Sequence, residues 1–300
     1  MLKSAASGLP PVRRLLDQRN ALLREREILT SRVRELLEQN NALRTQLTES
    51  GHQPAVPAPA PGATPYEQWF ASVFGVFGVS PNTFPATTWA ITDPWGAQVN
   101  DRMVDIEAAY AEALLIEIET RAIPGAIVEF GVFRGEWLLR LIKACERNGI
   151  RRQIFGFDSF EGLPPPSAEH DLDCWAEGDY AAGLEEVGQH LEVARRPNVK
   201  LVKGWFSESL HADDAQAIRE IAFARVDCDL YEPAVTCLDY LDGRLSDGSI
   251  LVFDDWTFNL AKGETRAFAE WAERKPPYRF EFLCFNSIGH LYIRVHHASR

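Results

Sequence analysis

The sequence lacks long apolar runs, and it lacks the cysteine and histidine spacings of common metal and redox motifs. No stretch reaches about 18 uncharged apolar residues, and the first residues do not contain the apolar segment of a secretion signal. The cysteines are widely separated, at positions 145, 174, 228, 237 and 284. We therefore expect no transmembrane helix, and reduced, mostly buried thiols in a cytoplasmic protein.

Positive charge is also scarce. Lysine and arginine number 31 against 43 aspartates and glutamates, which leaves a formal net charge of −12. This balance argues against a protein whose whole surface attracts nucleic acid or anionic lipid. A hydrophobic content of 46% and a charged content of 25% are close to ordinary globular usage, so we expect at least one domain with its own core.

Residues 1–50 carry a heptad repeat. Leucine recurs every seven residues, and Asn40 stands at one of the alternate core positions. A sustained seven-residue repeat winds helices around each other, and a single core asparagine favours a two-stranded parallel register. The pattern predicts a homo-oligomer formed through residues 12–47. Leu16, Leu23 and Leu37 widen the apolar stripe, so a lone helix packed on its own domain is the alternative.

Two further segments precede the main domain, which we place at residues 66–300. Residues 51–65 are rich in proline and alanine and favour a semi-rigid linker. Residues 66–100 are rich in aromatic residues and follow no long period. They are interpreted as a cap of short helices on the core, with a lid over a substrate pocket as the sharper alternative.

From residue 104 onward the chain alternates between helices and short apolar strands. Helices are predicted at 104–121, 136–148, 183–195, 215–221, 234–245 and 264–274, and strands at 126–132, 153–159, 199–204, 221–230 and 249–256. Such alternation is typical of a doubly wound parallel α/β sheet. Two final strands, at 279–285 and 290–295, are too close in sequence for a helix between them and must form an antiparallel hairpin. This layout is that of class I methyltransferases (Rossmann-like) rather than of dehydrogenases.

The first three strands end in residues suited to a small-molecule cofactor. Glu129, Gly131, Val132 and Gly135 follow the first strand, and the two glycines allow a sharp turn beside a ligand. Asp158, with Ser159, ends the second strand and is placed to accept the hydroxyls of an adenosine ribose; a turn or helix-cap role is the alternative. Gly204 and Trp205 follow the third strand, where the indole would line an adenine slot or simply join the core.

Four carboxylates follow the next two strands: Asp227 and Asp229 after the fourth, Asp254 and Asp255 after the fifth. Clustered anions need a cation or a shared proton, and oxygen ligands without histidine or cysteine select Mg²⁺. We assign Asp227, Asp254 and Asp255 as ligands. Since alternate residues of a strand point the same way, Asp229 is expected beside Asp227 but nearer solvent, where it would take a proton from a substrate hydroxyl. Helix caps and turns are the alternative.

The segments GAIVEFGVFRGE, FGFDSFEGLPPP, VDCDLYE, DGSILVFDDW and KGETRAF together resemble the macrocin O-methyltransferase (TylF/MycF-type) family, over roughly residues 100–295. The resemblance implies a class I fold, S-adenosylmethionine, Mg²⁺ and a sugar or glycan hydroxyl as acceptor. It also implies the same three aspartate ligands, with Asp229 as the base. A short segment ending at Met103 is similar to one that approaches the cofactor in this family. The coiled coil and the linker are not part of the family pattern.

Two other interpretations compete with a methyltransferase. In a glycosyltransferase, the Asp227–Asp229 motif would hold Mg²⁺ against a nucleotide sugar, but the second acidic pair and the preceding Asp158 argue against it. A non-catalytic coiled-coil scaffold with a methyltransferase-like domain would be expected to lose metal ligands, whereas all three are present. The sequence does not specify the sugar or the hydroxyl.

Overall fold

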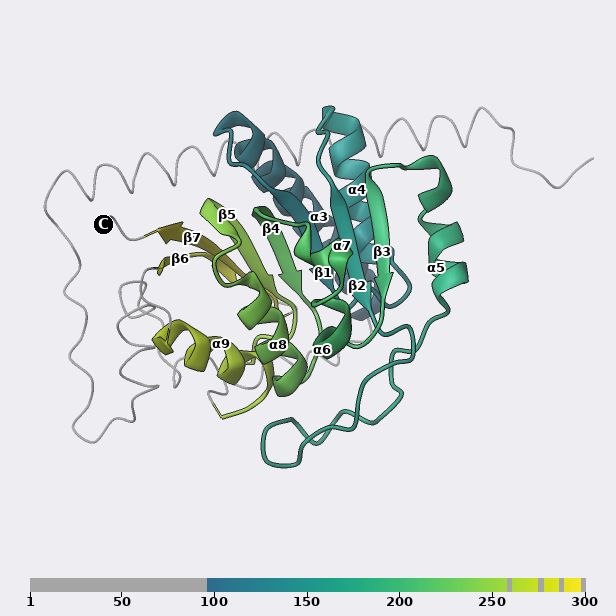
Figure 1. Ribbon diagram of the computed structural model, residues 1–300, viewed down its shortest axis with the longest axis vertical. Coiled ribbons are helices and arrows are strands. Elements are labelled where there is room, and N and C mark those ends of the chain that lie inside the picture. Colours follow the sequence, from purple (N-terminus) through teal and green to yellow (C-terminus); the bar gives the residue numbers. More distant parts are fainter. Residues whose placement is uncertain (1–95, 258–260, 275–277, 286–288, 298–300) are drawn as a thin grey trace, which may run out of the picture.

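The computed structural model describes residues 96–257, 261–274, 278–285 and 289–297. Within them, seven strands form one sheet in the order β3-β2-β1-β4-β5-β7-β6 (Figure 1). The predicted coiled coil, the linker and residues 66–95 of the predicted cap lie outside the described residues. The strands are β1 (Ala126–Phe130), β2 (Ile154–Asp158), β3 (Val199–Lys203), β4 (Ile221–Val226), β5 (Leu245–Phe253), β6 (Tyr278–Phe285) and β7 (Leu291–His297).

The direction of the strands follows the prediction. The strands β1 to β5 pair in parallel, and β7 runs antiparallel to both β5 and β6. Every residue of β1 and β4 is buried, as expected for central strands covered on both faces. The predicted doubly wound sheet with a C-terminal antiparallel hairpin is therefore confirmed, and its strand order is that of class I methyltransferases.

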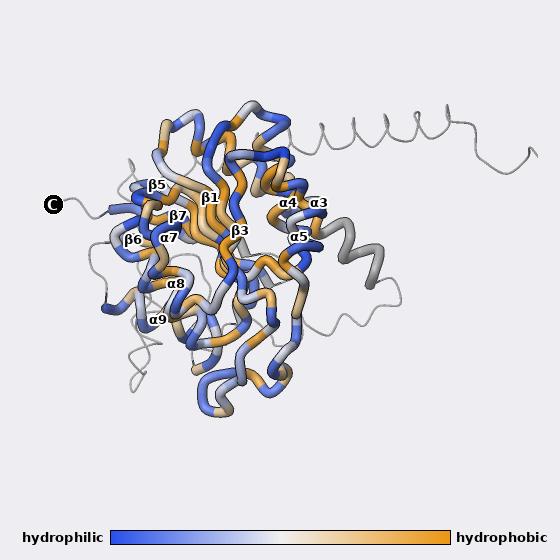
Figure 2. The backbone as a smooth tube through the Cα atoms, turned by 45° about the vertical axis from the view of Figure 1, so that its right-hand side comes forward, coloured by the Kyte–Doolittle hydropathy of each residue, from blue (hydrophilic) through white to orange (hydrophobic). Residues whose placement is uncertain are grey.

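Helices cover both faces of the sheet, as Figure 2 shows from the side. On one face a core of buried side chains joins the sheet to α3 (Gly96–Thr120), α4 (Glu136–Asn148), α5 (Leu184–His190) and the short η3 (Val193–Arg195). On the other face a second core joins it to α6 (Phe206–Ser209), α7 (Asp213–Gln216), α8 (Tyr231–Leu241) and α9 (Gly263–Arg274). No helix within the described ranges is long and apolar enough to cross a membrane.

Several predicted boundaries were wrong. The helix α3 begins at Gly96 rather than at residue 104, so it includes the last residues of the segment interpreted as a cap. The predicted helix 183–195 divides into α5 and η3. The helix predicted at 215–221 lies earlier, as α7 at Asp213–Gln216, and Ile221 already pairs in the sheet. The strand β4 ends at Val226 instead of residue 230, and β5 spans Leu245–Phe253 instead of residues 249–256. These ends are set by pairing between strands, which periodicity does not report.

Candidate active site

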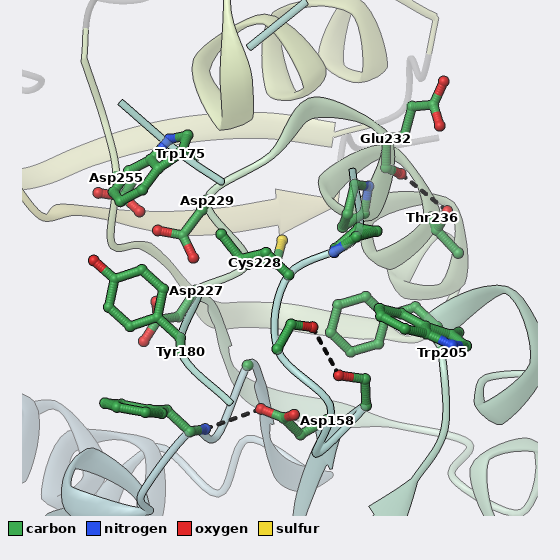
Figure 3. Close-up of a pocket in the computed structure, with 18 of the residues that line it drawn as sticks. Asp158, Trp175, Tyr180, Trp205, Asp227, Cys228, Asp229, Glu232, Thr236 and Asp255 are labelled. Atoms are coloured by element: carbon green, nitrogen blue, oxygen red, sulfur yellow. Dashed lines mark hydrogen bonds between the residues drawn. The ribbon is translucent and has the colours of Figure 1, made fainter. Parts of the chain in front are cut away.

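A cavity of about 500 Å³ opens at the carboxyl ends of β1, β2, β4 and β5. Figure 3 shows that Asp158 and Trp205 lie at one end of this pocket, while Trp175, Asp229 and Asp255 lie at the other. Open α/β sheets bind ligands beyond the carboxyl ends of their strands, where the strand order reverses. The pocket occupies this position, between β1 and its neighbours on each side.

The loop after β1 requires glycine at Gly131. Its φ is +84°, and an added Cβ would lie 1.5 Å from the carbonyl oxygen of Asp227. The amide of Asp227 donates to the carbonyl of Phe130 at 2.9 Å, so the ends of β1 and β4 are in direct contact. Gly135, also at positive φ (+79°), is the N-cap of α4. The two glycines thus let the loop turn tightly into α4 beside the start of the acidic cluster.

Asp158 ties this loop to the end of β2. Its Oδ2 accepts hydrogen bonds from the amides of Val132 at 2.7 Å and Phe133 at 2.9 Å, and its Oδ1 accepts one from Phe160 at 2.6 Å. A carboxylate has about four acceptor sites, so these three bonds leave capacity for one ligand hydroxyl. Asp158 therefore fills the turn role given above as its alternative, through the amide of Phe160, and it also fixes the loop after β1 and lines the pocket.

The remaining predicted cofactor residues differ in whether they line the pocket. Ser159 and Trp205 line the pocket, and Trp205 is 37% exposed. Val132, Gly135 and Gly204 shape the surrounding loops but are not lining residues. Glu129 lies behind the pocket, 1% exposed. Met103 lies on α3, but its side chain is outside the described part of the structure.

The three predicted metal ligands come together. One carboxylate oxygen from each of Asp227, Asp254 and Asp255 lies within 4.8 Å of the other two. All three side chains line the pocket and are partly buried. A set of hard oxygen donors at this spacing fits a divalent cation of the Mg²⁺ type. The donor chemistry is therefore compatible with the ion that the sequence predicts.

The strand alternation predicted for Asp229 was wrong. Because β4 stops at Val226, the alternation of a strand does not reach Asp229, whose φ is +62°. Asp229 turns toward Asp255, and the two side chains share a hydrogen bond. Burial, reinforced by the charge of Asp255, raises the pKa of Asp229 to about 10, and burial also raises the pKa of Asp255. Two adjacent carboxyl groups in a confined site favour a shared proton.

Arg225 is the principal residue that the sequence analysis missed. Its guanidinium pairs with Glu129, Asp227 and Asp254, and its side chain is only 5% exposed. It lies 5.1 Å from the ring of Trp137 on α4. A lone charge inside the apolar strand segment AFARV was the available signal, since a buried arginine needs anionic partners.

Two more side chains, one buried and one partly buried, contact the acidic cluster. Glu264, at the start of α9, accepts hydrogen bonds from the amides of Cys228 at 2.9 Å and Asp255 at 3.3 Å, so it joins the loops after β4 and β5. His290 contacts Glu107 through Nδ1 at 2.7 Å and lies 3.3 Å from Asp254 through Nε2. The motif containing Glu264 was recognised in the sequence, but nothing there indicated that its side chain reaches backward to two other loops.

The long segment after β2 closes the acidic end of the pocket. It carries Trp175 and Tyr180, both of which line the cavity. Asp171, in the same segment, accepts a hydrogen bond at 2.7 Å from the amide of Tyr231, the first residue of α8. No periodic pattern marks this segment in the sequence, and its place over the pocket depends on such distant contacts.

Comparison with known proteins shows which family the sequence matches. A family model for macrocin O-methyltransferases (TylF) matches residues 100–275. The 8-demethyl-8-(2,3-dimethoxy-α-L-rhamnosyl)-tetracenomycin-C 4′-O-methyltransferase of Streptomyces olivaceus is 30% identical over 149 residues, which cover 47% of this chain and 56% of that protein. The demethyldecarbamoylnovobiocin O-methyltransferase of Streptomyces niveus is 28% identical over 148 residues, covering 45% of this chain and 53% of that protein.

A solved structure shares the fold. The O-methyltransferase NovP superposes with a TM-score of 0.53 at 22% identity, covering 65% of this chain and 80% of NovP. The alignments to the two Streptomyces relatives span only about half of each relative's length. The structural match supports the class I methyltransferase fold derived from the strand order.

Proposed function

Because the chain belongs to the macrocin O-methyltransferase (TylF) family, we propose that it transfers a methyl group from S-adenosylmethionine to the hydroxyl of a sugar. The observation that carries the proposal is one continuous pocket. At one end it is lined by Gly131, Asp158 and Trp205, and at the other by the cluster of Asp227, Asp254 and Asp255. The first end suits an adenosyl cofactor, and the second suits an acceptor hydroxyl.

The cofactor end would hold S-adenosylmethionine through contacts that the loops already offer. Asp158 retains one acceptor site for a ribose hydroxyl. The exposed indole of Trp205 would pack against the adenine. The turn at Gly131 would bring backbone close to the amino acid part of the cofactor.

Asp227, Asp254 and Asp255 would hold the Mg²⁺ ion. A bound Mg²⁺ supplies Lewis-acid activation of the acceptor hydroxyl. Arg225 keeps two of the three carboxylates oriented from behind, and Glu264 fixes the backbone of Asp255. The cluster is thus held in place by residues that do not line the pocket, which favours a preorganised site.

Asp229 is proposed as the base. S-adenosylmethionine would supply the methyl group to the acceptor oxygen and would leave as S-adenosylhomocysteine, while Asp229 would take the hydroxyl proton. For this step Asp229 must be ionised, whereas its pKa is raised to about 10 by burial and by Asp255. The positive charge of a bound Mg²⁺ would favour the ionised form of Asp229. Asp229 would therefore act as a base when the three neighbouring aspartates hold the ion.

The sugar acceptor is inferred from the relatives. One relative is named for a rhamnosyl compound and the other for a novobiocin precursor. The acceptor would therefore be a sugar of a glycan or of a glycosylated natural product. We further propose that residues 12–47 form a homo-oligomer, which sedimentation of this segment as a peptide would test.

Two measurements test the proposal: isothermal titration for cofactor binding, and a methylation assay for activity. The protein should bind S-adenosylhomocysteine, and with Mg²⁺ and labelled S-adenosylmethionine it should methylate members of a set of methyl pyranosides. Binding of a nucleotide sugar without binding of S-adenosylhomocysteine would overturn the proposal in favour of glycosyl transfer. Activity that is unchanged by a metal chelator would overturn the Mg²⁺ assignment while leaving the methyltransferase assignment intact.

A further inference from the structure

An aromatic wall, formed by Phe133, Tyr180 and Trp175, runs along the pocket from the cofactor loop to the acidic cluster. The rings of Phe133 and Tyr180 meet edge to face, with centroids 5.4 Å apart at 88°. The rings of Tyr180 and Trp175 meet similarly, at 5.9 Å and 64°. All three residues line the cavity. The amide of Phe133 also donates to Asp158, so the wall begins at the loop that shapes the cofactor end.

Contacts within the segment after β2 hold the backbone next to Tyr180 in place. The amide of Leu163 donates to the carbonyl of Asp179 at 2.8 Å, and the amide of Gly178 donates back to Leu163 at 2.9 Å. These bonds close the base of the segment directly beside Tyr180. The backbone next to Tyr180 is therefore held by hydrogen bonds to Leu163.

Contacts with the helices fix the far part of the segment. Asp171 is buried and accepts hydrogen bonds from the amides of Ser167 and Tyr231, each at 2.7 Å. The carbonyl of His170 accepts one from Gly263 at 2.7 Å, and its ring contacts Arg266 on α9. The segment is thus fastened to both α8 and α9, so Trp175 and Tyr180 are presented to the pocket from a supported loop.

Tyr180 lies directly against the acidic cluster. Its side chain is 46% exposed, although it has aromatic neighbours on two sides. Figure 3 shows its ring beside Asp227, with Asp229 and Asp255 near the hydroxyl. In agreement, burial and then the neighbouring acidic groups of Asp229 and Asp255 raise the pKa of Tyr180. An exposed aromatic surface and a group of hydroxyl acceptors therefore share one end of the pocket.

That combination matches the two chemical surfaces of a pyranose. Such a ring presents polarised C–H groups on one face, which suit the negative face of an aromatic ring. Its hydroxyls point outward and bond to carboxylates. We propose that Tyr180 and Trp175, backed by Phe133, form the acceptor subsite and stack against the C–H face of a pyranose, whose reacting hydroxyl is directed at Asp227 and Asp229. This inference rests on the proposed function and adds the residues that select the acceptor.

The test compares Tyr180→Ala and Trp175→Ala with Trp205→Ala, using a methyl pyranoside that the wild-type protein methylates. Loss of one stacked ring should raise the KM for the glycoside about five- to tenfold in each of the first two variants. Binding of S-adenosylhomocysteine should stay within twofold of wild type. Trp205→Ala is the matched control, since it removes an aromatic group from the opposite end. It should weaken binding of S-adenosylhomocysteine, while the glycoside KM measured at saturating S-adenosylmethionine should stay close to that of wild type.

Tyr180→Phe separates stacking from hydroxyl chemistry, because it keeps the ring and should keep the KM within twofold of wild type. The inference is overturned if Tyr180→Ala and Trp175→Ala, folded by circular dichroism, keep the wild-type KM. It is also overturned if the wild-type protein methylates catechol but no pyranoside. A wild-type protein that binds no S-adenosylhomocysteine would instead refute the proposed function. The two failures are therefore distinguishable.

Discussion

Arg225 on β4 is paired with Glu129 on β1, both in the register of the sheet and through an ion pair of 3.0 Å. The same guanidinium also bonds Asp227 and Asp254. One buried cation therefore serves three carboxylates, and the charges do not balance. Glu129 is the most deeply buried of the three acids, and burial raises its pKa to about 8 despite the neighbouring Arg225.

The raised pKa of Glu129 predicts a pH dependence of stability. The folded value of about 8 lies above the ordinary 4.5, so the folded protein favours the protonated acid. The resulting stabilisation is fully present below pH 4.5 and is lost as the pH rises through about 8. Between pH 6 and pH 9, wild type should lose stability relative to Glu129→Gln, by on the order of a few kcal/mol. Urea unfolding at several pH values measures the difference.

An exposed substitution, Glu192→Gln, controls for the general effect of removing a carboxylate. It should follow the wild-type pH profile. If Glu129→Gln also follows that profile, Glu129 is ionised in the folded protein and the assignment of its proton is wrong.

Removal of Arg225 should be strongly destabilising. Arg225→Met leaves three acids without their shared cation, and loss of one partner of a buried ion pair costs roughly 3–5 kcal/mol. The double variant Arg225→Met/Glu129→Gln also removes the most deeply buried partner of Arg225 and should recover part of that loss, most clearly above pH 8, where Glu129 would be charged. A double-mutant cycle by urea unfolding gives the coupling energy. Additive effects of the two substitutions would contradict the shared pairing.

Asp229→Asn tests the proposed base. The amide cannot accept the proton, so turnover should fall by about 10²- to 10⁴-fold. Binding of S-adenosylhomocysteine should not change, because Asp229 lies at the opposite end of the pocket from Asp158. Single-turnover rates and isothermal titration measure the two quantities. A rate near that of wild type would show that another group accepts the proton.

Asp254→Ala tests the proposed metal ligand. The Mg²⁺ concentration that gives half the maximal rate should rise on the order of tenfold or more, together with a loss of maximal activity. The control is Asp239→Ala on α8, an exposed carboxylate paired at 3.7 Å with Arg274. An equal response of the two variants to Mg²⁺ would remove Asp254 from the ligand set.

Gly131→Ala tests the contact between the ends of β1 and β4. The new Cβ would overlap the carbonyl oxygen of Asp227 at 1.5 Å. Gly149→Ala is the matched control, because Gly149 also has positive φ (+67°) but no atom within 4 Å of an added Cβ. Backbone strain alone should cost the control roughly 1–2 kcal/mol. Gly131→Ala should cost distinctly more and weaken binding of S-adenosylhomocysteine. Equal losses in thermal unfolding would show that the loop relaxes without strain.

The sequence predicted the acidic cluster in part. Asp227, Asp254 and Asp255 were placed together because each follows an apolar strand, and parallel strands bring their carboxyl ends to one edge. The three carboxylates do lie together. The strand alternation predicted for Asp229 was wrong, because β4 ends at Val226 and Asp229 has a φ of +62°. Backbone torsions at a strand end depend on local contacts, so strand alternation cannot be carried beyond the last paired residue.

The sequence by itself determined the α/β fold, the antiparallel end of the sheet, the family and the edge at which the acidic residues gather. All of these follow from patterns that are local along the chain or carried by contiguous motifs. Only the tertiary structure decided that Arg225 pairs with two of the three proposed ligands and that Glu264 joins two loops. It also placed Tyr180 beside the acidic cluster in the pocket. The reason is physical: these contacts join segments far apart in sequence, and their geometry is set by how the strands pair and pack.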